Sequence, residues 1–312
     1  MKSSVKKVKS IGKRAVAIER NLRRIFLLLA LTLFVLAPAS FAQSGSPAPS
    51  PTPAASPVRS LERRFFANIL KDQYAIWTSP FHLRGRDARW LAPLGAASAA
   101  LFATDKRTAG ALDNNETRLR ISRDVSRFGT GYAVGGAAAA FYLIGKAAHN
   151  GRARETGLLA AEALVDSGIV AQTLKFATQR PRPLDKGGSG GFFDGGNSFP
   201  SGHSTSIWSL AAVIDGEYGK RHRLVRYGVY GLATAVSLSR YTGRNHFLSD
   251  VLVGSAIGYG VGHFVYLRHH DANLDAPDGT KKITKMEKYF PRIAPQYDVR
   301  SRTYAAALAW NF

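Results

Sequence analysis

Residues 239–267 read SRYTGRNHFLSDVLVGSAIGYGVGHFVYL. The first twelve residues hold all the arginine and aspartate of this stretch, and an apolar run of helical length follows them. Gly254, Gly258 and Gly262 recur at every fourth position of that run, which places them on one side of a helix. A side that lacks side chains lets the backbone of another helix approach closely. The stretch therefore predicts a helix packed tightly inside a helical bundle.

The rest of the chain shows the same helical character. From Arg59 onward no period-two alternation occurs until the C-terminus, while alanine-rich and leucine-rich runs recur at helical length. We therefore predict an all-α fold, a bundle of about six core helices, with a short strand-like tail. The expected helices cover residues 61–75, 88–104, 128–148, 157–178, 204–219, 224–241 and 247–267.

The N-terminal region reads as an export segment followed by a linker. Residues 1–24 are basic, an apolar run follows them, and small residues precede Ala42. This pattern predicts a signal peptide over residues 1–42 that is cleaved after Ala42, with an uncleaved anchor as the alternative. Residues 43–58 are rich in Pro, Ser and Ala, which favours an extended linker. We expect one helical domain over residues 59–271 and a tail over 272–312.

Composition narrows the chemistry. The 312 residues include no cysteine, which excludes disulfides, thiolate metal sites and a cysteine nucleophile. The formal net charge is +22, of which residues 1–24 carry about +8, so about +14 remains for the mature chain. An excess of this size suits anionic substrates, anionic lipids or nucleic acid, and does not choose among them.

The first of three polar stretches, KFATQRPRP over residues 175–183, closes the helix expected at 157–178. Prolines at 181 and 183 stop the helix, so Arg182 projects from the connection that follows. Lys175 lies two turns earlier and can point the same way. An ammonium group and a planar guanidinium aimed at one place suit a tetrahedral oxyanion. Basic residues at a helix C-terminus also simply complement the helix dipole, and this alternative remains open.

The second stretch is SFPSGHS over residues 198–204, where a helix is expected to begin. The backbone N–H groups of Ser201 and Gly202, together with the Ser201 hydroxyl, can bind an anion at the positive end of the helix dipole. His203 then lies on the first turn beside that anion. The alternative is a serine N-cap with an unrelated histidine.

The third stretch opens the helix expected at 247–267. His246 and Asp250 are four residues apart, so on the first turn of a helix they share a face and the carboxylate can hydrogen-bond a ring nitrogen. That bond fixes the tautomer and makes the other nitrogen a better base and nucleophile. Arg240 supplies a further guanidinium at the preceding helix end. An ordinary histidine and aspartate at a helix start is the alternative.

In chain order these stretches read Lys-x6-Arg-Pro, Pro-Ser-Gly-His and Ser-Arg-x5-His-x3-Asp. The series resembles the motifs of the type 2 phosphatidic acid phosphatase (PAP2) and vanadium haloperoxidase superfamily, and no element is missing or substituted. The matched block spans residues 175–250, about a quarter of the chain. The family's helical bundle agrees with the fold expected above.

The resemblance implies a role for each matched residue. His246 attacks phosphorus, Asp250 supports His246, and His203 protonates the leaving oxygen. The phosphate is cradled by Lys175, Arg182, Ser201, Gly202 and Arg240.

The implied function is a metal-independent, acid-type phosphatase. We expect it to hydrolyse phosphomonoester or diphosphate groups through a phosphohistidine on His246. The expected substrate is a lipid. Uncatalysed hydrolysis of phosphate esters is so slow that the enzyme must neutralise the oxyanion and position a nucleophile and an acid. Three cationic side chains and a helix N-terminus can neutralise the oxyanion in place of metal ions. No cofactor, metal or nucleic acid is expected, and His269-His270-Asp271 is interpreted as a solvated helix end, with a metal site as the alternative.

Two other functions stay open. A vanadium-dependent haloperoxidase would use the same pocket for vanadate, although a short exported chain favours the phosphatase. A basic envelope protein that binds anionic lipids or polymers without catalysis is the second alternative, and the intact His203, His246 and Asp250 argue against it.

The expected location is the bacterial cell envelope, with the active site facing the periplasm. The segment 128–148 is apolar enough to span a membrane, while Glu162 and Asp166 interrupt 157–178, so we expect a bundle embedded in or lying on a membrane. At the C-terminus, larger side chains alternate from Tyr304 to Phe312, as in the final strand of outer-membrane barrel proteins. One strand cannot make a barrel, so we predict a short edge strand or docked tail.

Overall fold

The computed structural model describes residues 61–185, 188–275, 292–298 and 303–309. The predicted signal peptide or anchor and the predicted linker lie outside these residues. The chain divides into two compact units, Met1–His270 and Asp271–Phe312.

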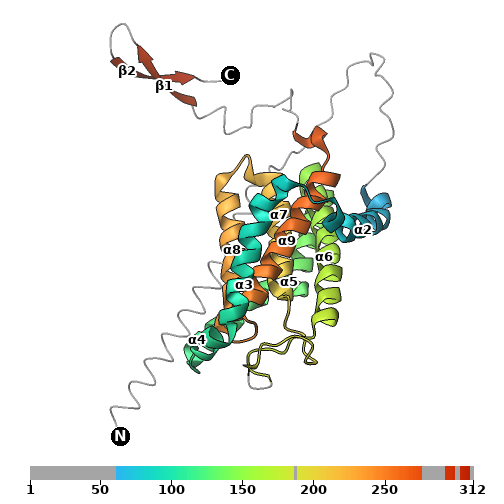
Figure 1. Ribbon diagram of the computed structural model, residues 1–312. Helices are drawn as coiled ribbons and strands as arrows, with labels where there is room; N and C mark the ends of the chain where they lie inside the picture. The colour runs from blue at the N-terminus through green and yellow to red at the C-terminus, as the bar shows by residue number, and fades with distance from the viewer. Residues whose placement is uncertain (1–60, 186–187, 276–291, 299–302, 310–312) are drawn as a thin grey trace. The chain divides into compact units, whose positions relative to one another are not determined.

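The described part of the first unit is a bundle of eight α-helices (Figure 1), so the predicted all-α class is confirmed. Short 3₁₀ turns lie between some helices, and a π-helical turn extends α7. The helices are α2 (Leu61–Thr78), α3 (Ala88–Gly110), α4 (Glu116–Ser126), α5 (Gly131–Ala147), α6 (Gly151–Thr178), α7 (Gly202–Ile214), α8 (Arg223–Thr242) and α9 (Leu248–His269). The short turns are η1 (Ser79–His82), η2 (Gly85–Asp87), η3 (Arg127–Gly129) and the π-helical η5 (Asp215–Gly219).

The core of this unit surrounds α7, which packs against α5, α6, α8 and α9. Nine of its thirteen residues are buried, as expected for a helix enclosed on all sides. The core side chains come from α5 to α9, and α3 adds a sixth helix through its contact with α9. Helix α2 packs on α6, and α4 packs on α8.

The glycines of α9 allow direct backbone contact with α7. A Cβ added to Gly258 would lie 2.2 Å from the Thr205 carbonyl oxygen, and one added to Gly254 would lie 2.6 Å from that of Ser201. Gly262 is equally close to the next turn of α7. The predicted close approach of a helix to this glycine face is therefore confirmed.

The helix boundaries differ from expectation at three places. Helix α3 continues to residue 110, α6 begins at residue 151, and α4 was not predicted at all. Five of the eleven residues of α4 are charged, so it lacks the apolar pattern that reveals a core helix. Its start is fixed instead by Asn115, whose Oδ1 accepts a hydrogen bond from the Arg118 backbone N–H at 2.9 Å.

Within the described residues, α6 and α9 are long and apolar enough to cross a membrane. The pair α4–η3 and α5, bent by 41°, would add a third span if it crosses as one. Helix α6 qualifies by length and composition although it carries Glu162 and Asp166, and both of these side chains are buried inside the bundle.

The second unit contains a short turn, η6 (Ala272–Asp275), and a two-stranded antiparallel sheet. Strand β1 (Arg292–Asp298) pairs with β2 (Thr303–Ala309), with Tyr297 opposite Tyr304. The strand expected near the C-terminus is present as β2, but its partner β1 was not predicted from the sequence. The aromatic residues at 310 and 312 lie outside the described residues.

Candidate active site

The three polar stretches meet at one end of the first unit. Helices α6 and α8 end there, α7 and α9 begin there, and the loop 179–201 leaves the lower end of the bundle in Figure 1. His203 belongs to the second stretch, and the groups that act electrostatically on it come from the other two: Arg240, His246, Arg182 and Lys175. The fold thus gathers the predicted site residues around one point.

His246 lies in the turn before α9 and is only 2% exposed. Its Nδ1 is 3.6 Å from Asp250 Oδ2, somewhat longer than the direct hydrogen bond that the spacing predicted. The Ser198 hydroxyl joins the two groups, since it donates to Asp250 Oδ2 at 2.5 Å and lies 3.3 Å from His246 Nδ1. The sequence reading did not identify Ser198, although the residue lies within the second stretch.

This arrangement selects one tautomer of His246. Since the Ser198 hydroxyl gives its proton to Asp250, its oxygen is left to accept a hydrogen bond from Nδ1–H. The lone pair of His246 then lies on Nε2. Burial lowers the pKa of His246 to about 4, against the opposing effect of Asp250, so the ring is neutral at pH 7. A neutral ring with a free Nε2 can act as a nucleophile.

Asp250 is held in place by a buried arginine that sequence reasoning missed. Arg180 is 1% exposed, and its Nη1 donates to Asp250 Oδ1 at 2.6 Å. Its Nη2 donates to Asp105 Oδ2 on α3 at 2.9 Å. The guanidinium thus pairs with two fully buried carboxylates, and removing it would leave both without a counter-charge. Arg180 belongs to the first stretch, but nothing in the sequence links Asp105 to it.

Aromatic rings enclose this ion pair. The Arg180 guanidinium carbon lies 4.3 Å from the Phe247 ring centroid, 5.1 Å from that of Phe102 and 5.2 Å from that of Phe192. Rings of this kind exclude water and attract the cation through their π faces. The carboxylate behind His246 is therefore fixed by packing as well as by charge.

Lys175 and Arg182 approach the site from the end of α6 and the loop after it. Lys175 Nζ donates to the carbonyl oxygens of Asn197 at 2.6 Å and Pro200 at 2.7 Å. Arg182 Nε donates to Asn197 Oδ1 at 3.2 Å. An ammonium group has three N–H donors, so these two bonds leave one donor of Lys175 for a ligand.

Arg240 is the most unusual cation of the site. It is 8% exposed, and its Nε is buried and donates to no acceptor. Burial first, and then the charge of Arg182, lower its pKa to about 10, so it remains charged at pH 7. A buried guanidinium donor without an acceptor is costly, and an oxyanion would supply the missing partner.

The start of α7 differs in one detail from expectation. The Ser201 backbone N–H donates to the Asp250 carbonyl oxygen at 3.0 Å, so it is not available to an anion. The Ser201 hydroxyl accepts from Ser204 Oγ at 3.1 Å. N–H groups in the first turn of a helix have no intrahelical acceptor, so Gly202 and His203 remain as the amides for a ligand.

His203 lies on the first turn of α7 and is partly exposed. Burial first, and then Arg240, lower its pKa to about 4. A bound dianion would offset the surrounding positive charge and raise that pKa again. Gly129 supports the residue from behind, since an added Cβ there would lie 3.2 Å from the His203 Cβ.

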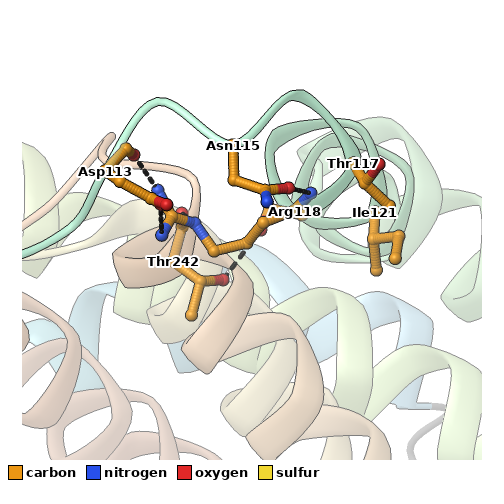
Figure 2. Close-up of a pocket in the computed structure, with 7 residues that line it drawn as sticks. Asp113, Asn115, Thr117, Arg118, Ile121 and Thr242 are labelled. Carbon is orange, nitrogen blue, oxygen red and sulfur yellow. Dashed lines mark hydrogen bonds and ion pairs between the residues drawn. The ribbon is translucent and has the colours of Figure 1, made fainter. Parts of the chain in front are cut away.

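A separate hollow lies between α4 and the end of α8 (Figure 2). Its cation, Arg118, is already paired with Asp113 Oδ1 at 2.6 Å and with the Thr242 carbonyl oxygen at 3.2 Å. Since its charges pair with each other, this hollow does not offer the unpaired positive charge that an anion requires.

The predicted solvated end of α9 is wrong. The side chains of His269 and His270 are only 11% and 10% exposed. His269 pairs with Asp72 and Glu162, and His270 pairs with Glu155 and Glu217. The four acids are distant in sequence from the histidines, so local spacing gave no sign of these pairs.

Comparison with known proteins bears on the three stretches. Residues 156–274 match the family model described as the PAP2 superfamily. That segment contains every residue of the predicted site, from Lys175 to Asp250.

Two curated relatives come from Porphyromonas gingivalis. The chain is 33% identical over 92 residues to a lipid A 1-phosphatase, which is 30% of this chain and 21% of that protein. It is 34% identical over 76 residues to a lipid A 4'-phosphatase, which is 24% of this chain and 31% of that protein. The chain thus spans less than a third of the length of either relative.

Two solved structures are more distant. LpxE from Aquifex aeolicus is 20% identical, with a TM-score of 0.41 over 53% of this chain and 93% of that chain. A transmembrane PAP2-type phosphatidylglycerolphosphate phosphatase from Bacillus subtilis has the same identity and TM-score, over 66% of this chain and 94% of that chain.

Proposed function

We propose, from the match of residues 156–274 to the PAP2 superfamily model, that the chain is a metal-independent phosphatase acting on phosphorylated lipids. The observation that carries the proposal is the buried Nε of Arg240, which has no acceptor in a site that already holds Lys175, Arg182 and two histidines. Such a site is completed by a tetrahedral anion. Positive charge from the protein takes the place that metal ions hold in other phosphatases.

The first chemical step assigns the two histidines. Nε2 of His246 attacks phosphorus and forms a P–N bond, while the bond from phosphorus to the leaving oxygen breaks and that oxygen takes a proton from His203. Nδ1–H of His246 stays bonded to the Ser198–Asp250 pair, which stabilises the positive charge that develops on the ring.

In the second step water attacks the phosphohistidine. His203, now neutral, takes a proton from that water, and the P–N bond breaks to return His246 and release inorganic phosphate. The phosphoryl oxygens remain on Arg240, Arg182 and Lys175 throughout, so charge that develops in either transition state meets donors that are already in place.

A lipid substrate is supported by both the relatives and the surface. The two curated relatives are lipid A phosphatases. Large apolar side chains are exposed near the site, among them Phe176, Leu184 and Phe193. An apolar rim beside a cationic cradle fits a molecule that has an acyl or prenyl chain and a phosphate.

The test is a substrate panel on the purified chain. Phosphatidic acid, an isoprenyl diphosphate, lipid A and a water-soluble aryl phosphate are compared by phosphate release, with His246→Ala as the negative control. We expect kcat/KM to be highest for one of the lipids. Vanadate-dependent bromination without phosphate release would show a haloperoxidase instead, and lipid binding without turnover would show a non-catalytic envelope protein.

We also propose that the chain is membrane-associated with its site facing the periplasm. His269, at the far end of α9, pairs with Asp72 on α2, so α2 lies at the end of the bundle opposite Asp250. If residues 1–42 export the start of α2 to the periplasm and the active site also faces the periplasm, both ends of the bundle lie on the same side of the membrane. The bundle then lies on or partly within a leaflet and does not cross the membrane from end to end.

Single cysteines in this cysteine-free chain test the placement. Ser189→Cys reports the site end and Lys220→Cys the opposite end, and both positions are exposed. We expect a membrane-impermeant thiol reagent to label both variants in intact cells. Labelling of Lys220→Cys alone would place the site in the cytoplasm and refute the proposal.

A further inference from the structure

A second cluster of titratable side chains lies at the end of α9 opposite the candidate active site. His269 Nε2 is 2.7 Å from Asp72 Oδ2 on α2 and 3.4 Å from Glu162 Oε1 on α6. One ligand atom from each of the three residues lies within 4.8 Å of the other two. Asp166, one turn beyond Glu162, acts electrostatically on the same groups. Three helices thus bring an imidazole and three carboxylates to one place.

The carboxylates of this cluster are buried but incompletely bonded. Asp72, Glu162 and Asp166 are at most 1% exposed. Asp72 Oδ1, Glu162 Oε1 and Asp166 Oδ2 are buried and accept no hydrogen bond. Buried acceptors without donors are rare in folded proteins and costly, so each one calls for an explanation. Three such oxygens in one cluster indicate that a positively charged partner belongs among them.

The charges of the cluster also indicate a bound cation. In the described contacts, the three carboxylates of this cluster face two cationic groups, His269 and Arg268. Arg268 Nε is 3.4 Å from Asp72 Oδ1, and the Arg268 side chain is 40% exposed. With all three carboxyls ionised and His269 protonated, one negative charge would be left over; without an ion, burial and then Asp72 raise the pKa of Glu162 to about 8, so that carboxyl holds a proton at pH 7. A divalent cation bound to a neutral His269 would balance the three carboxylates together with Arg268. Buried charge of one sign without a counter-ion is strongly disfavoured.

The neighbouring cluster of His270 supplies a contrast within the same bundle. His270 Nδ1 lies between Glu155 Oε1 at 3.0 Å and Glu217 Oε1 at 3.1 Å. Arg152 donates to Glu217 Oε2 at 3.1 Å. Although one ligand atom from each of His270, Glu155 and Glu217 also lies within 4.8 Å of the other two, the two carboxylates here meet one guanidinium and one imidazole, and no buried side-chain oxygen of the group lacks a hydrogen bond. This cluster is complete without an ion.

We propose that Asp72, Glu162 and His269 bind a divalent metal ion of the zinc or manganese type, with Asp166 as a further carboxylate beside it. One imidazole nitrogen and two or three carboxylate oxygens form a donor set that such ions accept. Two ligand atoms bound to one ion at about 2.0–2.2 Å lie about 3–3.5 Å apart. His269 Nε2 and Glu162 Oε1, at 3.4 Å, already have this spacing, while His269 Nε2 and Asp72 Oδ2, at 2.7 Å, would separate slightly to admit the ion. The ion joins α2 to α6 and α9, and so fixes the first helix to the bundle.

The ion lies far from the phosphate chemistry. Asp250 and His269 stand at the two ends of α9, which at about 1.5 Å per residue separates them by about 29 Å. The metal therefore has a structural role, and its presence is compatible with metal-independent turnover at the other end.

The experiment measures metal content and thermal stability of the purified full-length chain, without reference to activity. The protein is stripped with EDTA, then dialysed against zinc or manganese, and bound metal is counted by plasma mass spectrometry. We expect about one ion per chain and a melting temperature several degrees above that of the stripped protein. Glu162→Gln and Asp72→Asn should each weaken metal binding about a hundredfold or more.

Glu217→Gln, in the complete neighbouring cluster, is the matched control and should bind metal like the wild type. Since Gln resembles a neutral glutamate in shape, Glu162→Gln is expected to fold, and His269→Gln provides a second test of binding if it does not. Substoichiometric metal in the wild type would overturn the proposal. So would unchanged binding in Glu162→Gln, or loss of binding in Glu217→Gln alone.

Discussion

The two ends of α9 each carry a histidine beside a buried carboxylate, yet their surroundings have opposite sign. At the start of the helix, His246 and Asp250 face cations, and the buried atoms left without partners are donors, Arg240 Nε and Arg244 Nε. At the end of the helix, His269 meets several acids, and the atoms left without partners are acceptors. Similar pairs thus lead to different ligands, an anion at one end and a cation at the other.

This difference teaches that a histidine–carboxylate pair alone does not define a function. The pair fixes a tautomer or a geometry, and the charge around it decides what can bind. The unpaired atoms are the most direct indicator, because a buried polar atom without a partner is expensive unless a ligand completes it. The following experiments change one end while the other serves as reference.

The largest effect is expected from removing the nucleophile. His246→Ala should lower kcat by about 10⁴-fold or more, because no other group can form the P–N bond. His203→Ala should still become phosphorylated by a substrate whose leaving group needs no proton. Rapid-quench labelling is expected to find acid-labile phosphate on His246. His263→Ala, on the exposed face of α9, is the control and should leave both activity and labelling unchanged.

Undiminished labelling of His246→Ala would remove His246 from the mechanism.

The next effect concerns the unpaired donor. Arg240→Lys should lower kcat/KM by about 10²–10³-fold, because an ammonium group cannot reproduce the guanidinium fork. Arg118→Lys, in the hollow of Figure 2, keeps the charge at a paired arginine outside the site and should have little effect. Steady-state kinetics compare the two variants, and equal losses would mean that Arg240 acts through folding rather than through the phosphate.

A smaller and graded effect is expected from pH. The pKa of His203 is lowered to about 4, so in the free enzyme its protonated form becomes scarcer as pH rises. Because the leaving oxygen needs that proton, kcat/KM should rise as pH falls from 8 to 5, by up to about tenfold per unit. Below about pH 4 it should fall, as His246 takes up a proton.

The substrate phosphate also titrates in this range, so His203→Asn is the reference whose pH profile reports the substrate alone. A wild-type profile that rises with pH, or that matches His203→Asn, would contradict the role of His203 as the acid.

The smallest effect on turnover is expected from EDTA. Chelation acts on the proposed cation site and should leave the initial rate at moderate temperature unchanged, since Lys175, Arg182 and Arg240 neutralise the phosphate. The melting temperature should fall in the same sample. Vanadate should inhibit competitively, because it resembles the five-coordinate phosphorus. Immediate loss of activity with EDTA and rescue by zinc or magnesium would overturn the metal-independent mechanism.

The parts of the molecule that were predictable are those whose signal is local. Helical periodicity located seven of the eight helices in the part of the chain that the structure describes, and the spacing of three glycines predicted the α7–α9 contact. The missed helix, α4, carries too much charge to show an apolar face, and its cap at Asn115 is a single residue. The three motifs predicted which residues would meet, because each lies where a helix ends or begins.

What could not be predicted depends on contacts between distant residues. Arg180 stood in the first motif, but its partner Asp105 comes from another helix and its role follows only from burial. Ser198 lies in the second motif, but its position between His246 and Asp250 could not be predicted from the sequence. The end of α9 was misread for the same reason, since the acids that surround His269 are far away in the sequence.

The close contact between α7 and α9 predicts which glycine substitutions in α9 cause loss of function. A methyl group at Gly258 would meet the Thr205 carbonyl, and the displacement would pass along α7 to His203 two residues away. A saturation screen for activity should therefore record Gly258→Ala as a loss-of-function allele, although the residue touches no substrate. Gly260, on the same helix, has open space where its Cβ would lie, and should tolerate alanine. Activity is thus expected to depend on the glycine side of α9, which has no catalytic side chain.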